Sequence, residues 1–263
     1  MATKLTVLGG SAASVGTGQG CSGYLVSTDE TSLVLDLGPG TLLELRKHVD
    51  FRALDGIVLS HLHVDHMLDL IALRFSLAFN PVKPERRVPL WLPPGGIAFF
   101  DRLAQVFSTD GDANAFFYEV FDIGEFRPHG QLQINDVALS FAPTVHFVPC
   151  WAIRVHPNDE SDDLVYTADT GPTADLAEFT AGAQVVLSEA TTPEEQRDAM
   201  PFAARGHLTA REAAHLAREA GATILVLTHM FEENNPPALV NAAQSVFEGE
   251  LVHAVPGASV TWS

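Results

Sequence analysis

Short apolar runs separated by turn residues dominate the first part of the chain and predict a meander of strands. Apolar positions at helical spacing then predict a helix over Met67–Phe79. The stretch Pro81–Pro94, rich in proline and arginine, is expected to be a loop region. The strands expected in this part are Lys4–Leu8, Gly23–Ser27, Leu33–Asp36 and Gly56–Ser60.

Strand and helix patterns alternate through the rest of the chain. Further strands are expected at Val137–Ala142, Ala152–Val155, Leu164–Thr167, Val185–Ser188, Ile224–Leu227 and Ser259–Trp262. Helices are expected near Ala174–Phe179, Ala210–Ala220 and Pro237–Phe247. Many strands interleaved with helices indicate an α/β protein of stacked layers. No repeat or linker divides the sequence, so we expect one domain over residues 1–263.

The glycine-rich segment between Gly9 and Gly20 raises the question of a nucleotide-binding loop. Such a loop must lead from a strand into a helix, whereas these glycines lead into the apolar run at Tyr24–Val26, which is another strand. A long turn between two strands is therefore the favoured interpretation, and a loop at the rim of an active site is the alternative.

The composition of the chain indicates which cellular compartment and which kinds of partner to expect. The 263 residues are 46% hydrophobic and 18% charged, which is typical of a globular protein. The net charge of −18 repels polyanions and disfavours nucleic acid as a partner. No apolar run approaches the roughly 20 residues of a membrane span, and the residues before the first predicted strand have none of the features of a signal peptide. With only two cysteines, Cys21 and Cys150, the chain is expected to be cytoplasmic.

The segment Ser60-His61-Leu62-His63-Val64-Asp65-His66 carries the strongest chemical signal. His61 and His63 follow a predicted strand at i and i+2, and side chains at that spacing project to the same side of an extended segment, so the two imidazoles could share one metal ion. Asp65 and His66 come where the chain turns into the next helix and could face a second ion. Three histidines and an aspartate in this register are a poor match to chance, and the pattern predicts a site for two metals.

Two metals need more than four ligands, and three further candidates follow predicted strands. His146, Asp169 and His229 each come at or just after an apolar run, where a sheet edge would deliver their side chains to a common rim. A single histidine at a strand end is usually a capped or solvent-facing residue. Together with the first motif, however, the three positions favour a shared metal centre.

At this point the sequence resembles the metallo-β-lactamase superfamily, and within it the ribonuclease Z-like phosphodiesterases. The resemblance extends over nearly the whole chain and includes the His61–His66 block, the segment Tyr166–Pro172, the segment Ser188–Thr191 and the segment Gly206–Ala210. It implies a four-layer αβ/βα sandwich, in which two mixed β-sheets are flanked by helices and a dinuclear metal site lies at the sheet edge.

The resemblance also implies a ligand set and a reaction. His61, His63 and His146 would hold one ion, Asp65, His66 and His229 the other, and Asp169 would bridge both. Zinc is favoured, with manganese and iron as alternatives, because histidine and aspartate suit all three. A hydroxide shared by the two ions would attack the phosphorus. Asp36 resembles the buried residue that supports the ligand loop through hydrogen bonds.

His207 narrows the reaction class. It precedes Thr209-Ala210-Arg211-Glu212, which predicts a capping box at the start of the helix that ends before Gly221. The resemblance implies that His207 contacts the scissile phosphate as general acid and that Glu189 orients it, so Asp65, Glu189 and His207 are the expected catalytic residues. The alternatives are an exposed loop position for His207 and a purely structural role for Glu189.

Substrate size is bounded from above. The transfer-RNA endonucleases of this family carry a long arm between the third histidine motif and the bridging aspartate, whereas here only residues 147–168 separate the two. A small phosphodiester, with a cyclic nucleotide as the leading candidate, is therefore the expected substrate. A ribonuclease Z-type transfer-RNA 3′ endonuclease is the second hypothesis, and a lactamase, a thioesterase or a metal-binding module without catalysis is less favoured. Relatives are often dimers, so a homodimer is one expectation.

Overall fold

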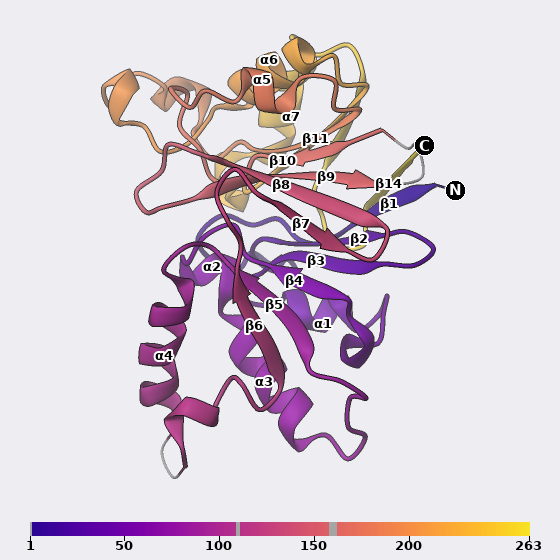
Figure 1. The fold of residues 1–263 in the computed structure, drawn as a ribbon. Coiled ribbons are helices and arrows are strands. Elements are labelled where there is room, and N and C mark those ends of the chain that lie inside the picture. Colours follow the sequence, from indigo (N-terminus) through magenta and orange to yellow (C-terminus); the bar gives the residue numbers. More distant parts are fainter. Residues whose placement is uncertain (1, 109–110, 158–161) are drawn as a thin grey trace.

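In a computed structural model, which describes residues 2–108, 111–157 and 162–263, the chain folds into two seven-stranded sheets that face each other (Figure 1). The first sheet has the order β14-β1-β2-β3-β4-β5-β6 and the second β13-β12-β11-β10-β9-β8-β7. Each sheet takes nearly all of its strands from one half of the chain. Only β14, the last strand, returns to pair with β1 of the first sheet.

Both sheets are mixed. In the first, β14, β1, β2 and β3 pair antiparallel, and β3, β4, β5 and β6 run parallel. Its strands are β1 (Thr3–Gly9), β2 (Gly23–Ser27), β3 (Ser32–Leu37), β4 (Gly56–Val58), β5 (Val88–Leu92), β6 (Phe121–Glu125) and β14 (Ser259–Trp262).

The second sheet repeats this division, with β7 to β10 antiparallel and β10 to β13 parallel. Its strands are β7 (Gln131–Ile134), β8 (Val137–Pro143), β9 (Trp151–Pro157), β10 (Leu164–Tyr166), β11 (Val185–Glu189), β12 (Ile224–Thr228) and β13 (Glu250–His253).

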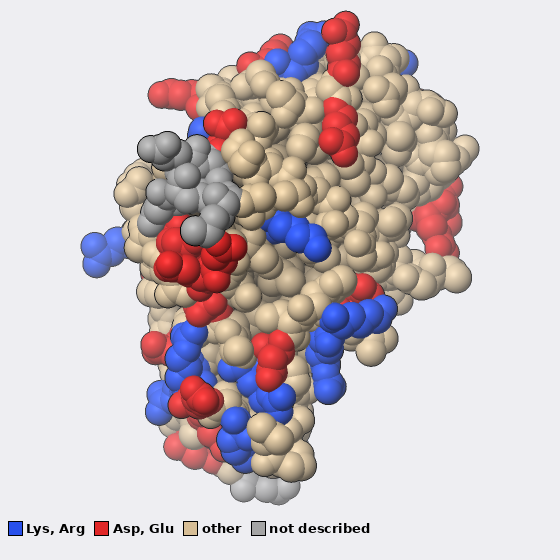
Figure 2. Space-filling model, turned by 90° about the vertical axis from the view of Figure 1, so that its right-hand side faces the viewer, with Lys and Arg blue, Asp and Glu red and all other residues tan. Residues whose placement is uncertain are grey.

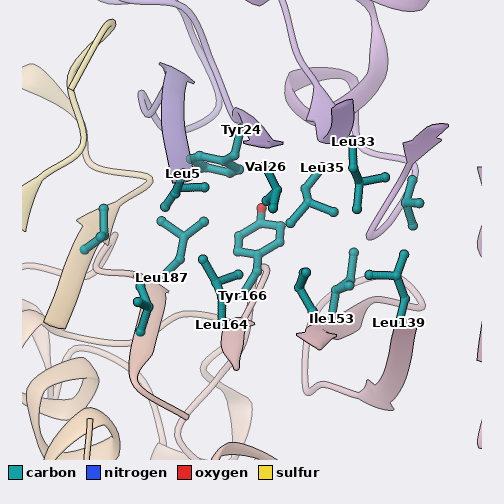
Figure 3. Close-up of a cluster of buried hydrophobic side chains, with 14 of the residues drawn as sticks. Leu5, Tyr24, Val26, Leu33, Leu35, Leu139, Ile153, Leu164, Tyr166 and Leu187 are labelled. Carbon is teal, nitrogen blue, oxygen red and sulfur yellow. The ribbon is translucent and has the colours of Figure 1, made fainter. Parts of the chain in front are cut away.

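The largest core lies between the two sheets (Figure 3). Leu33 and Leu35 of β3 point into it, whereas Val34 between them packs in a second core on the outer face of the sheet. In the same way, Val185 and Leu187 of β11 face the other sheet, and Val186 faces outward. Strands buried on both faces appear in the sequence as continuous apolar runs, which is why these strands were predictable.

Helices cover the outer faces and complete four layers, so the predicted αβ/βα sandwich is confirmed. The first sheet is covered by α1 (Thr41–Leu45), α2 (Val64–Met67), α3 (Asp69–Phe79) and α4 (Gly96–Phe107), and the second by α5 (Ala177–Thr180), α6 (Ala210–Ala220) and α7 (Pro236–Gln244). Short 3-10 turns lie at Phe51–Ala53, Ala113–Ala115, Glu194–Gln196, Phe202–Ala204 and Glu232–Asn234.

Several predicted elements differ from the structure. The stretch Pro81–Pro94 is not all loop, because β5 lies within it, and Val88, Leu90 and Leu92 are buried in the core between the first sheet and its helices. The helix expected over Ala174–Phe179 is only the short α5. The helix expected over Met67–Phe79 is α3, which begins at Asp69, and a separate one-turn helix, α2, precedes it. None of the helices among the described residues combines the length and the hydropathy that a bilayer span requires.

Candidate metal centre and active site

The candidate residues meet at one edge, to which both sheets contribute the carboxyl ends of parallel strands. His61 and His63 follow β4, Asp169 follows β10, Glu189 ends β11 and His229 follows β12. His146 joins them from the connection between β8 and β9. Ligands of open α/β sheets bind outside the carboxyl ends of such strands, and the fold places the predicted residues there from both halves of the chain.

Four of the side chains form a first donor cluster, comprising His61, His63, His146 and Asp169, whose ligand atoms all lie within 4.8 Å of one another. Nδ1 of His63 is 3.2 Å from Nε2 of His61 and 3.0 Å from Nε2 of His146. Oδ2 of Asp169 lies 3.7 Å from Nε2 of His61 and 3.6 Å from Nε2 of His146. Three imidazole nitrogens and a carboxylate thus converge on one point.

A second donor cluster consists of Asp65, His66 and His229. Nε2 of His229 lies 3.1 Å from Oδ2 of Asp65 and 3.3 Å from Nε2 of His66. Asp169 lies between the two clusters, because its Oδ1 is 3.4 Å from Nε2 of His66 and its Oδ2 is 3.6 Å from Nε2 of His229. One carboxylate therefore faces both sets of imidazoles.

Asp36, at the end of β3, holds two of the histidines in place from behind. Its Oδ2 accepts hydrogen bonds from Nδ1 of His66 and from the hydroxyls of Ser60 and Tyr166, at 2.7 to 2.8 Å. Oγ of Ser60 also lies 3.0 Å from Nδ1 of His61. Both rings thus use Nδ1 for the protein, which leaves Nε2 to face the centre. Groups that orient ligands in this way are a regular part of metal sites.

Contacts through Nδ1 also hold His146 and His229 in place. Nδ1 of His146 donates to the carbonyl oxygen of Gly206 at 3.0 Å, and Nδ1 of His229 lies 2.7 Å from Oγ1 of Thr191. Oγ1 of Thr191 in turn donates to Oε2 of Glu189 at 2.7 Å. In both histidines Nε2 is again the nitrogen that faces the centre. The hydrogen-bonding partners therefore fix four of the five imidazoles in an orientation suited to a ligand.

Burial and charge tune these groups in directions that suit cation binding. Burial lowers the pKa of His61, His63 and His146 and keeps their rings neutral, as a metal ligand must be. Burial opposes the charged form of Asp169, but the surrounding imidazoles outweigh it and hold its pKa well below the usual range. Burial also opposes a charged His66, but Asp169 and Asp36 raise its pKa. The same carboxylates would attract a divalent cation.

The donor set fits a pair of metal ions. Oδ1 of Asp169 is buried and has no hydrogen-bond partner among the described residues, which is costly for a carboxylate oxygen that nothing coordinates. Imidazole nitrogens and carboxylate oxygens are the usual ligands of zinc, manganese and iron. The buried oxygen between two imidazole clusters is thus explained if Asp169 contacts two cations.

Three residues that support the centre have left-handed backbone. The φ angles are 57° at Asp36, 51° at Ala168 and 53° at His229, none of which is glycine. Such conformations cost roughly 1–3 kcal/mol each and are concentrated at functional sites. Gly38 allows another close approach, because a Cβ there would lie 1.9 Å from the carbonyl oxygen of Asp65. Backbone strain and close packing thus occur where the ligand loops leave their strands.

His207 lies at the rim of the centre and is paired with Glu189. Its Nδ1 is 2.9 Å from Oε1 of Glu189, and one of its ring nitrogens lies within 4.8 Å of the ligand atoms of Asp169 and His229. Glu189 is fully buried, and its carboxylate also accepts the backbone N–H of Thr170 at 2.7 Å. Burial opposes the imidazolium, but the charge and hydrogen bond of Glu189 outweigh it and raise the pKa of His207 to about 9.

The loop that carries His207 is anchored to the start of α6. The predicted capping box is present, since the side chain of Thr209 accepts from the backbone of Glu212 and Glu212 accepts from the N–H of Thr209. Arg205 adds a two-pronged ion pair to Glu212, at 2.6 and 3.0 Å. α6 ends at Gly221, which has a φ of 78° as expected of a C-cap. The position of His207 is thus set by contacts on both sides of it.

The structure brings all of the predicted site residues together at this edge: Asp36, His61, His63, Asp65, His66, His146, Asp169, Glu189, His207 and His229. The sequence pattern assigns no role to Ser60, Thr191 or Tyr166, yet in the structure they hold the histidines or Asp36 in place. The glycine-rich segment is a long turn between β1 and β2, and it also reaches the site, because the N–H of Ala13 donates to Oδ2 of Asp65 at 3.0 Å. The favoured interpretation, a long turn between two strands, is the observed one, and the contact with Asp65 is consistent with the alternative of a loop at the rim of the candidate site.

Comparison with known proteins indicates the same superfamily as the sequence resemblance. A family model described as a β-lactamase superfamily domain matches residues 31–230. The probable metallo-hydrolase YhfI of Bacillus subtilis is 30% identical over 250 residues, which cover 94% of this chain and 95% of that protein. Ribonuclease Z of Haloarcula marismortui is 26% identical over 303 residues, which cover 98% of this chain and 96% of that protein.

Solved structures of other proteins share this fold. The crystal structure of YhfI from Bacillus subtilis matches with a TM-score of 0.84 and 27% identity, covering 99% of this chain and 100% of that one. The short form of human tRNase Z matches with a TM-score of 0.76 and 19% identity, covering 98% of each chain, a likeness of fold alone. From the family match over more than half of its length and the 30% identity to YhfI across nearly all of both chains, the chain belongs to the β-lactamase superfamily.

Proposed function

We propose that this protein is a metallo-hydrolase, and specifically a phosphodiesterase that uses two divalent metal ions to cleave small phosphodiesters, with a cyclic nucleotide as the favoured substrate. Residues 1–263 form one hydrolase domain in this proposal, because both sheets contribute donors to a single centre. The observation that carries the proposal is the placement of Asp169 between two imidazole clusters, with the His207–Glu189 pair directly beside them.

The donors divide between the two ions as the geometry groups them. His61, His63 and His146 would hold one ion, and Asp65, His66 and His229 the other. Asp169 would contact both. When bound, such a pair of ions supplies a water of lowered pKa and neutralises charge on the phosphoryl group. Zinc is the favoured metal, and manganese and iron suit the same donors.

The chain's own acid is His207. Cleavage of a phosphodiester leaves an alkoxide that needs a proton, and an imidazolium can donate one near neutral pH. Glu189 holds Nδ1 of His207 at 2.9 Å, so that Nε2 is the nitrogen that donates to the leaving oxygen. The raised pKa keeps the ring protonated at pH 7. A lactamase or a thioesterase, which acts on an acyl group, would give this pair no evident role.

Chain length and charge favour a small substrate. β9 and β10 pair antiparallel, and only residues 158–163 connect them, too few for an arm that could clamp an RNA. Nucleic-acid binding draws much of its affinity from phosphate contacts by lysine and arginine. On the face drawn in Figure 2, the lysines and arginines are interspersed with acidic residues and form no continuous basic band over the part described.

Ribonuclease Z activity is the second candidate, because ribonucleases Z from archaea are sequence relatives of this chain over most of its length. Under that hypothesis the same metal centre and the same acid would act on a transfer-RNA precursor. The two hypotheses therefore differ in how the substrate is bound and agree on the chemistry.

A direct comparison of substrates tests the proposal. Purified protein with a measured metal content is assayed on bis(p-nitrophenyl) phosphate, on 3′,5′-cyclic AMP and on a transfer-RNA precursor, at equal enzyme concentration. We expect turnover of the first two and slower cleavage of the RNA. Faster RNA cleavage would reverse the ranking, and a protein with both ions bound but no turnover would indicate a metal-binding module.

The proposed setting is the cytoplasm. Cys21 and Cys150 are both buried and unpaired, and free thiols persist in reducing compartments. Burial raises the pKa of Cys21 to about 12, so its thiol is unreactive at neutral pH. A homodimer remains the proposed oligomer, on the resemblance to the family alone.

A further inference from the structure

A pocket of about 380 Å³ lies directly beside His207, and nothing above gives it a role. Its volume falls in the range of small-molecule sites. It lies between the loop that joins β8 to β9, the segment that leads to α6, and the turn after β12. Its walls include Phe147, Thr192, Gln196, Met200, His207 and Asn234.

Phe147 forms an open aromatic platform in this pocket. Its ring lies 5.1 Å from the ring of His146 and 5.8 Å from that of His207. Gly206 lies under one face, where a Cβ would come within 2.8 Å of the ring. Even so, 62% of Phe147 is exposed. A large aromatic side chain, positioned on a glycine and left uncovered beside the reacting centre, is suited to stack on a planar ligand.

Apart from His207, which also belongs to the reacting centre, the described wall of the pocket carries no free positive charge for an anion. Arg205 is the one lysine or arginine in its described wall, it is only 2% exposed, and both terminal nitrogens are engaged by Glu212. The remaining wall is apolar, as at Met200, or neutral and polar, as at Thr192. The chemistry therefore suits an uncharged ring and not a second phosphate.

Two amide side chains supply hydrogen-bonding groups in the wall. Asn234 donates through Nδ2 to the carbonyl oxygen of Thr191 at 3.2 Å, and no described residue donates to its Oδ1. No described residue bonds the side chain of Gln196, which is exposed. Amides of asparagine and glutamine match the alternating donors and acceptors on the edge of adenine. A nucleobase combines that edge with a flat apolar face.

We propose that this pocket binds the nucleobase of a small nucleotide substrate, with Phe147 as the stacking platform and Asn234 and Gln196 as the groups that contact the base edge. The inference rests on the proposed phosphodiesterase function, because His207 belongs both to the pocket wall and to the reacting centre. A small nucleotide would place its base on Phe147 and its phosphate at the neighbouring donor clusters.

Adenosine tests the pocket without any phosphate chemistry. Its binding to the metal-loaded protein is measured by calorimetry and by saturation-transfer NMR. We expect Phe147→Ala to weaken binding about tenfold, the scale of one lost base–aromatic stack, and Asn234→Ala to weaken it as well. The matched control is Phe79→Ala on α3, since Phe79 is 68% exposed and lines neither the pocket nor the centre.

Kinetics supply the second readout. With 3′,5′-cyclic AMP, Phe147→Ala should raise KM about tenfold with little change in kcat, because the ring contacts the base and not the reacting atoms. Adenosine should inhibit hydrolysis of bis(p-nitrophenyl) phosphate competitively. A short RNA ending in adenosine is assayed in parallel, and a preference for it of more than tenfold over cyclic AMP would overturn the assignment to a small nucleotide.

The outcomes separate the two proposals. If bis(p-nitrophenyl) phosphate is hydrolysed but adenosine does not bind at millimolar concentration, or binds equally to the Phe147→Ala protein, the base pocket is wrong and the phosphodiesterase proposal stands. If no phosphodiester is turned over, adenosine binding and its loss in the Phe147→Ala protein still decide the pocket. Because Phe147 is mostly exposed, its replacement is not expected to disturb folding, and the thermal midpoint checks this.

Discussion

Nδ1 of His207 lies 2.9 Å from Oε1 of Glu189, and the carboxylate of Glu189 is held in turn by Thr170 and Thr191. A buried carboxylate with several fixed donors cannot move away from its histidine at little cost. The pair is therefore rigid, and the proton on His207 depends on a residue that does not itself reach the metal centre.

We expect Glu189→Gln to lower kcat for 3′,5′-cyclic AMP, whose leaving group is an alkoxide that needs a proton, by roughly a hundredfold at neutral pH, the scale of a lost general acid. A general acid acts while protonated, so its contribution is present below its pKa and lost above it. Without the charge of Glu189, which raises the pKa of His207 to about 9, the decline on the alkaline side should begin at lower pH. The pH profile of kcat measures this shift.

The control for that prediction is a double variant. If Glu189 acts through His207, then His207→Ala and the His207→Ala/Glu189→Gln protein should have equal kcat. A further loss in the double variant, at unchanged metal content, would mean that Glu189 acts by another route.

Asp169→Asn should weaken the binding of both metal ions. Its carboxylate faces both donor clusters, whereas His229 belongs to only one of the two metal sets proposed above. Elemental analysis of the purified protein should find less than half of the wild-type metal in Asp169→Asn and about one ion lost in His229→Ala. The matched control, Asp175→Asn, changes an exposed aspartate outside the centre and should retain full metal. Two ions retained in Asp169→Asn would contradict the bridging role.

Two buried tyrosines with different partners offer a matched test of the role of Asp36. The hydroxyl of Tyr166 donates to the carboxylate of Asp36 at 2.8 Å, whereas that of Tyr24 pairs with the neutral hydroxyl of Thr228 at 2.6 Å. Tyr166→Phe should lower the free energy of unfolding by about 2 kcal/mol and Tyr24→Phe by about 1 kcal/mol, because bonds to charged groups are stronger. Urea denaturation measures both.

Only Tyr166→Phe should also weaken metal binding, by about tenfold, since Asp36 orients His66. Zinc titration against a chromogenic chelator gives the affinity. Equal effects of the two substitutions on zinc affinity would show that Asp36 orients His66 equally well without the hydrogen bond from Tyr166.

The ion pair between Arg205 and Glu212 should make stability depend on pH. Burial opposes ionisation of Glu212, but Arg205 outweighs it and lowers the pKa of the carboxyl. The stabilisation is therefore full above the unfolded pKa, about 4.3, and is lost as pH falls through the lower folded pKa. Glu212→Gln leaves a buried guanidinium unpaired and should cost about 3 kcal/mol at pH 7, a difference from wild type that shrinks in acid.

Chemical denaturation at a series of pH values tests this, with the exposed Glu219→Gln on the same helix as control. A constant difference between the wild type and Glu212→Gln across the acidic range would mean that the charge of Glu212 contributes nothing.

Much of the fold and of the donor set could be predicted because both have strong local signals. Strands such as β11 and β12 are buried on both faces and therefore appear as apolar runs, and the spacing of His61 and His63 is itself the geometry of a shared ligand site. The capping box before α6 is also a local pattern. Such features need no knowledge of distant contacts.

Features that depend on distant contacts could not be predicted. β5 lies in a segment rich in proline and arginine, and it forms a strand because β4 and β6 pair with it on either side. Nothing local marks Tyr166 as a partner of Asp36, since 130 residues separate them. The position of the Phe147 ring also depends on Gly206, which lies in the loop before α6, far along the chain from Phe147.

The division of the donors between the two sheets has a consequence for assembly. His61, His63, Asp65 and His66 come from the first half of the chain, and His146, Asp169 and His229 from the second. With the proposed ligand sets, neither half alone could coordinate an ion fully, so we expect metal uptake to follow the docking of both halves. Metal content should therefore report on completed folding, and a chain released before its last strands are made would remain apo.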